Sequence, residues 1–437
     1  MPATYTMSAT LTNLTIPQIN PWKAWLVCFA AALFFFYEFI QMNMFSSIDP
    51  ELMRAFSINA TQLGTLSSCY FYANVLFLFP AGIILDRYST RKVIQIAMLT
   101  CILGTFCFAK ATTLWSAEIY RFLTGIGSAF CFLSCIRLAS RWFPSHRMAL
   151  VTGLVVTIAM IGGMVAQIPL TLLTTTVGWR QALLWDTALG VIIWFIISMG
   201  VQDSPLTAVQ AKETHNLLPP SIGLWQGLRQ AWLRLQNWLG GIYTCLMNLP
   251  IILLGGLWGS LYLTQVQGLT RTQASLAITL IFIGTVLGSP LVGWLSDRIC
   301  RRRLPMLWGA LLSLGIMAVI IFNTQLSLTS TMLLFFSLGL FSSTQIISYP
   351  TIAESNSPAL TATSVSVISL CTQSAGVIFQ PLFGWLMDLH WQGQIVNNIH
   401  IYTAADYHRA LLILLGGFIV AFFAAVLLRE TFCRAQV

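Results

Sequence analysis

Long runs of apolar residues, separated by short polar stretches, form the main pattern along this chain. A helix needs about 20 apolar residues to cross the hydrocarbon core of a bilayer. Breaks at Pro, Gly and clusters of charge set the approximate limits of such runs. The pattern predicts an all-α membrane protein with twelve transmembrane helices, at residues 22–47, 61–84, 92–110, 114–138, 147–175, 181–201, 236–264, 273–295, 304–323, 329–351, 361–386 and 407–429.

The longest polar interruption, at residues 202–235, divides these helices into two sets of six. We therefore expect a first bundle at 22–201 and a second at 236–437, preceded by a disordered, Thr-rich tail at 1–21. The second part of the interruption places apolar residues at helical spacing, which fits a cytoplasmic linker with a helix lying on the membrane surface. It also fits the start of the seventh span. The apolar residues are Ile222, Trp225, Leu228, Trp232 and Leu235.

Composition and charge agree with a protein embedded in a lipid bilayer. The chain is 57% hydrophobic and only 8% charged, whereas a soluble domain carries roughly a quarter charged residues. Its net charge of +9 comes from basic residues in short loops, not from a basic face with interleaved aromatics, so we expect no nucleic-acid partner. Sixteen of the 22 Lys and Arg residues lie on one side and five on the other, which predicts that both termini are cytoplasmic.

The sequence carries none of the common signatures of an enzyme. It has no Gly-x-Ser-x-Gly, His-Glu-x-x-His or Walker loop, and no Cys-x-x-Cys or Cys/His spacing for a metal. Eight of the ten cysteines lie inside apolar runs, where they act as small hydrophobes. We therefore expect no enzymatic activity, no metal and no cofactor. Without a phosphate-binding loop, any energy for transport must come from an ion gradient or from the substrate gradient.

Two short clusters of charged residues follow the second and eighth predicted spans. In each, a Gly is followed four residues later by Asp-Arg and then by more basic residues, which predicts a tight turn at a membrane surface. This repeated pattern resembles motif A of the major facilitator superfamily. The resemblance covers the chain from Trp22 to Arg429 and implies two pseudo-symmetric six-helix bundles that work by alternating access. It also implies a gating role for Gly82, Asp86, Arg87, Arg91, Gly293, Asp297 and Arg298.

Two charged residues within the spans are candidates for function, because a charge inside a bilayer is costly. Glu38 and Arg121 both lie roughly 10–14 Å below the same membrane surface, given 1.5 Å per helical residue. The Arg121 segment, with Gly125 and Gly127 after it, resembles motif B of the superfamily, which implies a cavity-lining helix and a role in proton coupling or anion binding. One alternative is a permanent ion pair that locks two helices together, and Glu118 is a rival partner for Arg121.

Polar residues near this pair extend the expected binding site. Gln41 follows Glu38 by three residues, Thr124 follows Arg121 by three, and Tyr70 and Asn74 form an i, i+4 pair on the second span. In the second half the expected contacts are the uncharged Gln345 and Gln373. Each of these groups also fits a simpler role as a hydrogen bond between packed helices.

These observations favour a proton-coupled symporter for a small polar nutrient, an amino acid or short peptide, in which Arg121 binds the substrate carboxylate and Glu38 carries the proton. The runs Phe36–Asn43, Gln380-Pro381 and Tyr402–Tyr407 resemble nutrient carriers of the phagosomal-transporter type from intracellular gammaproteobacteria, which implies a bacterial inner membrane. The resemblance to the major facilitator fold implies a monomer. The alternatives are a drug or siderophore exporter of the same fold and a membrane sensor that does not transport.

Overall fold

The computed structural model describes residues 21–143, 147–203, 224–323, 326–357, 360–396 and 399–434. The first half of the chain contains α1 (Pro21–Asn43), α2 (Phe45–Phe56), α3 (Ala60–Arg87), α4 (Thr90–Ala109), α5 (Leu114–Ser128), α6 (Cys131–Trp142), α7 (Met148–Val165), α8 (Ile168–Val177) and α9 (Trp179–Gly200). The second half contains α11 (Leu224–Leu233), α12 (Leu235–Met247), the π-helix η2 (Pro250–Trp258), α13 (Gly259–Gln265), α14 (Arg271–Arg298), α15 (Arg303–Phe322), α16 (Leu328–Ser342), the 3-10 helix η3 (Ser343–Ile347), α17 (Ser348–Ser355), α18 (Thr361–Asp388), β1 (Ile395–Val396), β2 (Ile399–His400) and α19 (Ala404–Leu427).

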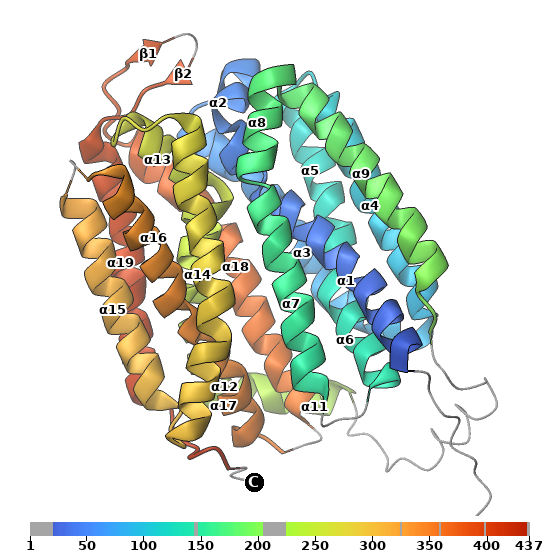
Figure 1. The fold of residues 1–437 in the computed structure, drawn as a ribbon. Coiled ribbons are helices and arrows are strands. Elements are labelled where there is room, and N and C mark those ends of the chain that lie inside the picture. The colour runs from blue at the N-terminus through green and yellow to red at the C-terminus, as the bar shows by residue number, and fades with distance from the viewer. Residues whose placement is uncertain are drawn as a thin grey trace, which may run out of the picture.

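These helices form two bundles that stand side by side (Figure 1). The described residues contain 12 helical stretches that are long and apolar enough to cross a membrane, which confirms the predicted number. We call the end of the molecule where α1 begins and α19 ends the terminal face. The opposite end, which carries α2, α8 and the small β1–β2 hairpin, is the distal face (Figure 1).

Several spans that the sequence predicts as single helices are broken in the structure. The first span ends at Asn43, before its expected end at 47, and a separate helix, α2, follows it and reaches Phe56. The fifth span breaks between α7 and α8, where Pro169 cannot donate a backbone hydrogen bond. The seventh contains the π-helix η2, which begins at Pro250. Both prolines are visible in the sequence, but the apolar runs continue across them, so counting apolar runs did not resolve these breaks.

The predicted linker is only partly described. Residues 204–223, and the N-terminal tail at 1–20, lie outside the described residues. The helix expected near the end of the linker is present as α11, with Trp232 and Leu233 exposed on it. Its position on a membrane surface stays a prediction.

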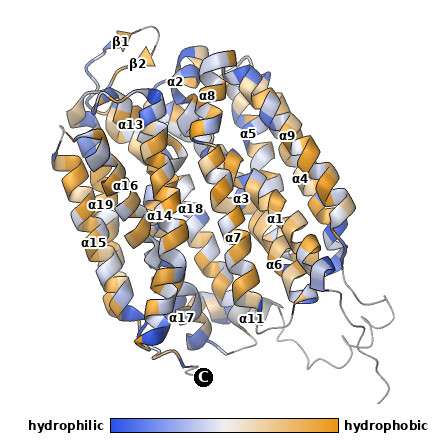
Figure 2. Cartoon of the chain, in the orientation of Figure 1, coloured by the Kyte–Doolittle hydropathy of each residue, from blue (hydrophilic) through white to orange (hydrophobic). Residues whose placement is uncertain are grey.

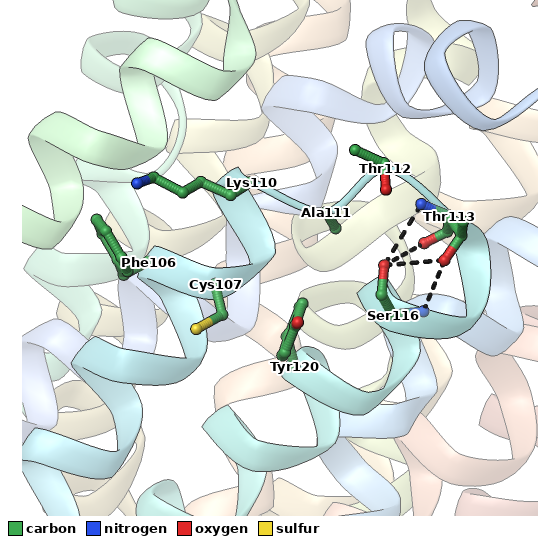
Figure 3. A pocket seen from close by; sticks show the side chains of 8 residues that line it. All are labelled: Phe106, Cys107, Lys110, Ala111, Thr112, Thr113, Ser116 and Tyr120. Atoms are coloured by element: carbon green, nitrogen blue, oxygen red, sulfur yellow. Dashed lines mark hydrogen bonds between the residues drawn. The ribbon is translucent and has the colours of Figure 1, made fainter.

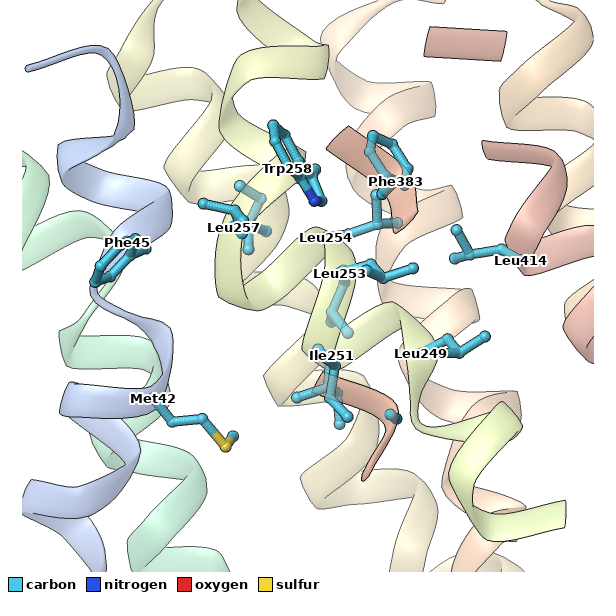
Figure 4. Close-up of a cluster of buried hydrophobic side chains, with 14 of the residues drawn as sticks. Met42, Phe45, Leu249, Ile251, Leu253, Leu254, Leu257, Trp258, Phe383 and Leu414 are labelled. Atoms are coloured by element: carbon cyan, nitrogen blue, oxygen red, sulfur yellow. The ribbon is translucent and has the colours of Figure 1, made fainter. Parts of the chain in front are cut away.

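Apolar side chains cover the outside of both bundles as well as their interior (Figure 2). Large side chains such as Ile192, Phe195 and Phe423 are more than half exposed, as expected for surfaces that face lipid. Inside, the π-helix η2 is completely buried and packs against α2 and α18 through residues such as Phe45, Trp258 and Phe383 (Figure 4). The Trp258 and Phe383 rings are stacked with their centroids 5.2 Å apart.

Candidate functional site

Glu38 and Arg121 both lie in the interior of the first bundle, but they do not form a direct ion pair. Glu38 on α1 is 2% exposed and Arg121 on α5 is 0% exposed. Tyr70 on α3 stands between them: its hydroxyl donates a hydrogen bond to the Glu38 carboxylate. The Tyr70 ring centre lies 4.6 Å from the Cζ atom of Arg121. The expected pairing is therefore bridged by a tyrosine, and the alternative of a permanent ion pair does not describe this arrangement.

The Arg121 guanidinium group lies between two aromatic rings and has no hydrogen-bond acceptor. Its Cζ atom lies 4.6 Å from the ring of Phe45 on α2, the same distance as from Tyr70. Its three side-chain nitrogens are all buried and have no hydrogen-bond partner. Cation–π contacts of this kind contribute up to about 2 kcal/mol when desolvated, but they leave the N–H groups unsatisfied. The second carboxylate oxygen of Glu38 is also buried without a partner.

Small residues bring the helices of this site together. A Cβ atom added to Gly125 on α5 would lie 2.2 Å from the backbone oxygen of Tyr70, so only a glycine permits this approach of α5 to α3. Nearby, Asn74 on α3 donates to the Ser128 hydroxyl on α5 over 2.8 Å. These two contacts fix the height of Arg121 relative to the Tyr70 ring.

Two of the other residues predicted to bind substrate are already bonded within the first bundle. Gln41 donates to Asp186 over 2.5 Å and accepts from Thr105 over 2.8 Å. The Thr124 hydroxyl donates to the backbone oxygen of Tyr120 on its own helix, over 3.0 Å. Together with Asn74, these residues support the helices that carry Glu38 and Arg121, and their contact with a substrate stays a prediction.

Asp186 is a buried carboxylate that the sequence reasoning missed. It lies on α9, is 6% exposed and accepts the hydrogen bond from Gln41. The rule that singled out Glu38 applies equally to Asp186, because it lies within the predicted span at 181–201. It therefore joins Glu38 and Arg121 as a third ionisable group inside the first bundle.

The predicted contacts of the second half lie on elements of the second bundle. Gln345 belongs to η3 and Gln373 to α18, and both elements pack against α12. Both side chains are partly buried. The structure shows no contact between either glutamine and Glu38 or Arg121, so their role in binding stays a prediction.

The predicted gate residues lie at the terminal face, where the two glycines are not in contact with another helix. A Cβ atom added to Gly82 or Gly293 would have no neighbour within 4 Å. Asp297 forms an ion pair over 2.6 Å with Arg302, which also pairs over 2.6 Å with Glu354 of α17, all within the second bundle.

In the first bundle, Arg91 donates to the backbone oxygen of Ser198 over 2.6 Å. The remaining gate residues, Arg87 and Arg298, are exposed. The side chain of Asp86 lies outside the described residues. The gating role of this set stays a prediction.

At the distal face the two bundles are in direct contact. Arg271 of α14 pairs with Glu51 of α2 and also donates to the backbone oxygen of Ser47 over 2.7 Å. Gln167, between α7 and α8, donates to the backbone oxygen of Gly255 in η2 over 2.9 Å. The structure is therefore closed at the distal face.

A surface pocket lies outside the set of predicted site residues. It has a volume of about 290 Å³ and lies between the distal end of α4 and the start of α5 (Figure 3). Lys110 stands at its edge, with Nζ 4.3 Å from the Phe106 ring centre. None of the residues that line it belongs to the predicted site.

Twelve spans in two bundles, with ionisable groups buried inside the first, are the architecture of a secondary transporter. The model of the Major Facilitator Superfamily matches residues 27–379 and 241–432, and the chain belongs to this family. It is a multi-pass membrane transporter and not an enzyme, as expected from the sequence.

Comparison with known proteins finds three that are similar to this chain. A D-galactonate transporter of Escherichia coli O6:H1 is 28% identical over 65% of this chain and 72% of its own length. The membrane sensor protein UhpC of Escherichia coli K12 is 22% identical over 71% of this chain and 72% of its own length. A bacterial homologue of the human lysosomal transporter Spinster, solved in an inward-facing and unoccupied conformation, has the same fold, with a TM-score of 0.72 and 16% identity over 93% of this chain and 96% of its own.

Proposed function

We propose that this protein is a proton-coupled uptake carrier for a small solute with a carboxylate group, with amino acids and short peptides as the expected substrates. One observation carries the proposal: Arg121 presents three buried N–H-bearing nitrogens that no protein group accepts. A guanidinium group binds a carboxylate through two parallel hydrogen bonds, and in a low-dielectric interior such a pair is strong. A substrate carboxylate would satisfy the donors that the fold leaves free.

Glu38 is the proposed proton carrier. It shares Tyr70 with Arg121, so a substrate carboxylate bound at Arg121 brings a second negative charge close to Glu38. Two like charges in one site repel, and protonation of Glu38 removes that repulsion. Binding of the anionic substrate and binding of a proton therefore favour each other, which is the requirement for symport.

The remaining predicted residues take supporting roles in this proposal. Gln345 and Gln373 are the proposed contacts from the second bundle. Gln41, Asn74 and Thr124 hold the helices around the charged pair, because their side chains are already bonded there. We further propose a monomer in a bacterial inner membrane. The bias of Lys and Arg between the two sides supports cytoplasmic termini.

An organic anion without an amino group is the second candidate substrate. The observation that favours it is the similarity to a D-galactonate transporter, whose substrate is a sugar acid with a carboxylate. Both candidates use Arg121 in the same way and differ in the group that Glu38 meets. A substrate with an amino group would place a positive charge near Glu38, whereas a sugar acid would place hydroxyl groups there.

Uptake into proteoliposomes tests the proposal directly. The purified protein is reconstituted, a pH gradient is imposed, and radiolabelled amino acids, dipeptides and sugar acids are supplied in turn. We expect gradient-dependent accumulation of at least one carboxylate-bearing solute, lost in Arg121→Lys and kept in Arg409→Lys, which changes an exposed arginine. Accumulation that persists after the gradient is collapsed would overturn proton coupling. Binding without uptake would favour a sensor, and net extrusion would favour an exporter.

A further inference from the structure

A third copy of the Gly-x-x-x-Asp pattern lies at the opposite face from the two predicted gate motifs. Gly384 and Asp388 end α18, which runs from the terminal face to the distal face. Their spacing is the same as that of Gly82 and Asp86 and of Gly293 and Asp297. Unlike Gly82 and Gly293, Gly384 is tightly packed in this structure.

Asp388 of the second bundle covers the start of α3 in the first bundle. Its carboxylate accepts from the backbone N–H of Thr61 over 2.8 Å and from the Thr61 hydroxyl over 2.5 Å. It also accepts from the backbone N–H of Ala60 over 3.3 Å. The next N–H of α3, at Gln62, is capped by Asn59 of its own chain segment. The first turn of α3 therefore depends on a carboxylate from the other bundle for two of its free donors.

Tyr402 completes this contact. Its hydroxyl donates to Asp388 over 2.6 Å and accepts from the backbone N–H of Ala60 over 2.9 Å. A negative charge at the start of a helix is also favoured by the helix dipole. The carboxylate thus gains charge-assisted hydrogen bonds and a favourable field at once, and all of these depend on α3 and α18 lying together.

Two glycines make this approach possible in a reciprocal way. A Cβ atom on Gly384 of α18 would lie 2.3 Å from the backbone oxygen of Ala60 on α3. A Cβ atom on Gly64 of α3 would lie 2.5 Å from the backbone oxygen of Gln380 on α18. The two contacts are therefore reciprocal. In each helix, the glycine lies four residues after the residue whose carbonyl oxygen contacts the glycine of the other helix.

We propose that Gly384 and Asp388 form a latch that holds the distal face closed during the transport cycle. Ala60 and Thr61 belong to the first bundle, and Asp388 and Tyr402 belong to the second. Any rotation that separates the bundles at the distal face must therefore break this set of bonds together. The latch stabilises one access state and makes no contact with the substrate site. The proposal is therefore independent of which solute is carried.

The test measures the distance between the bundles at the distal face in the full-length protein in nanodiscs. Spin labels are placed at Thr112→Cys in the first bundle and Thr329→Cys in the second, both at exposed positions. A preparation without these two cysteines measures the background from native thiols. We expect Asp388→Asn to raise the ratio of distal-open to distal-closed molecules roughly ten- to a hundredfold. We expect smaller shifts for Thr61→Val and Tyr402→Phe, and a Thr61→Val, Asp388→Asn double variant that shifts less than the sum of the two singles.

Two matched controls separate the latch from a general loss of stability. Asp406 caps its own helix, α19, with hydrogen bonds to Thr403 within the second bundle. Asp406→Asn should therefore lower the melting temperature without changing the distance distribution. Gly384→Ala should open the distal face, whereas Gly416→Ala, where an added Cβ has no neighbour within 4 Å, should not. Folded Asp388→Asn and Thr61→Val proteins with wild-type distances would overturn the proposal.

Discussion

Replacing Arg121 with Met should make the protein more stable and unable to bind its substrate. The guanidinium group is fully buried, has no hydrogen-bond partner and lies between the Phe45 and Tyr70 rings. Methionine has a similar length, fills the space between the rings and needs no acceptor. When a group serves binding at the expense of stability, its replacement should raise the stability of the fold and weaken binding.

The magnitude follows from the contacts that are lost and relieved. Arg121 is a buried charge without a hydrogen-bond partner. An uncompensated buried charge costs about 3–5 kcal/mol, and an apolar methionine removes that cost. Loss of two cation–π contacts, about 0.5–2 kcal/mol each, opposes this gain. We expect a net increase of about 1–2 kcal/mol in the free energy of unfolding. For a chain of this length, that is a rise of about 1–4 °C in the melting temperature.

Thermal unfolding in detergent, followed by tryptophan fluorescence, measures the first effect. The control is Arg180→Met, because Arg180 donates to the backbone oxygens of Ala109 and Ala111 over 3.0 and 2.7 Å. That variant should lower the melting temperature, since it leaves two acceptors without donors. Stabilisation by added substrate should be seen in the control and be absent in Arg121→Met. Equal destabilisation in both variants, or substrate stabilisation of Arg121→Met, would refute the reasoning.

Three further predictions concern pH and packing. Glu38→Gln should abolish accumulation driven by an imposed pH gradient while substrate exchange continues; accumulation that is still driven by the gradient in this variant would exclude Glu38 as proton carrier. Burial raises the pKa of Asp49 in α2 well above its usual value, although the charge of Arg271 opposes this, and neither carboxylate oxygen has a partner. The closed distal face therefore binds a proton more tightly than an open one, so closure is favoured at low pH and becomes less favourable as the pH rises through the raised pKa. Distance measurements across the distal face should show this pH dependence in the wild type and a weaker one in Asp49→Asn. Gly162→Ala should reduce the yield of folded protein severely, because its Cβ would lie 2.1 Å from the backbone oxygen of Phe36. Gly153→Ala on the same helix should be tolerated, because its Cβ would have no neighbour within 4 Å. Size-exclusion profiles of the two variants measure the difference.

The sequence indicated which residues matter more reliably than how they meet. Glu38 and Arg121 stood out because charges in apolar runs are rare, and both are buried as that rule requires. Their meeting through Tyr70 was not predictable, because periodicity places a residue on a helix but does not say which helix it faces. Gln41 shows the same limit: it lies three residues from Glu38, yet its amide is bonded to Asp186 on α9.

Some features were readable in the sequence and were missed. Asp186 met the same condition as Glu38. The Gly384–Asp388 spacing repeats that of the two gate motifs, but without a following arginine it did not attract attention. Other features had no such signal. The π-helix at Pro250–Trp258 and the cap that Asp388 places on α3 depend on contacts between residues that lie far apart in the sequence, 88 positions or more.

The sequence by itself determined the class of fold, because twelve apolar runs of spanning length allow few arrangements other than helices in a bilayer. The two clusters of charged residues, after the second and eighth spans, indicated that the chain has two related halves, and family membership agrees with this. Only the tertiary structure decided that the distal face is closed, that Arg121 has no acceptor and that Asp388 caps a helix of the other bundle. The physical reason is that hydropathy reflects the transfer of each residue from water to lipid, whereas these contacts depend on how two bundles meet.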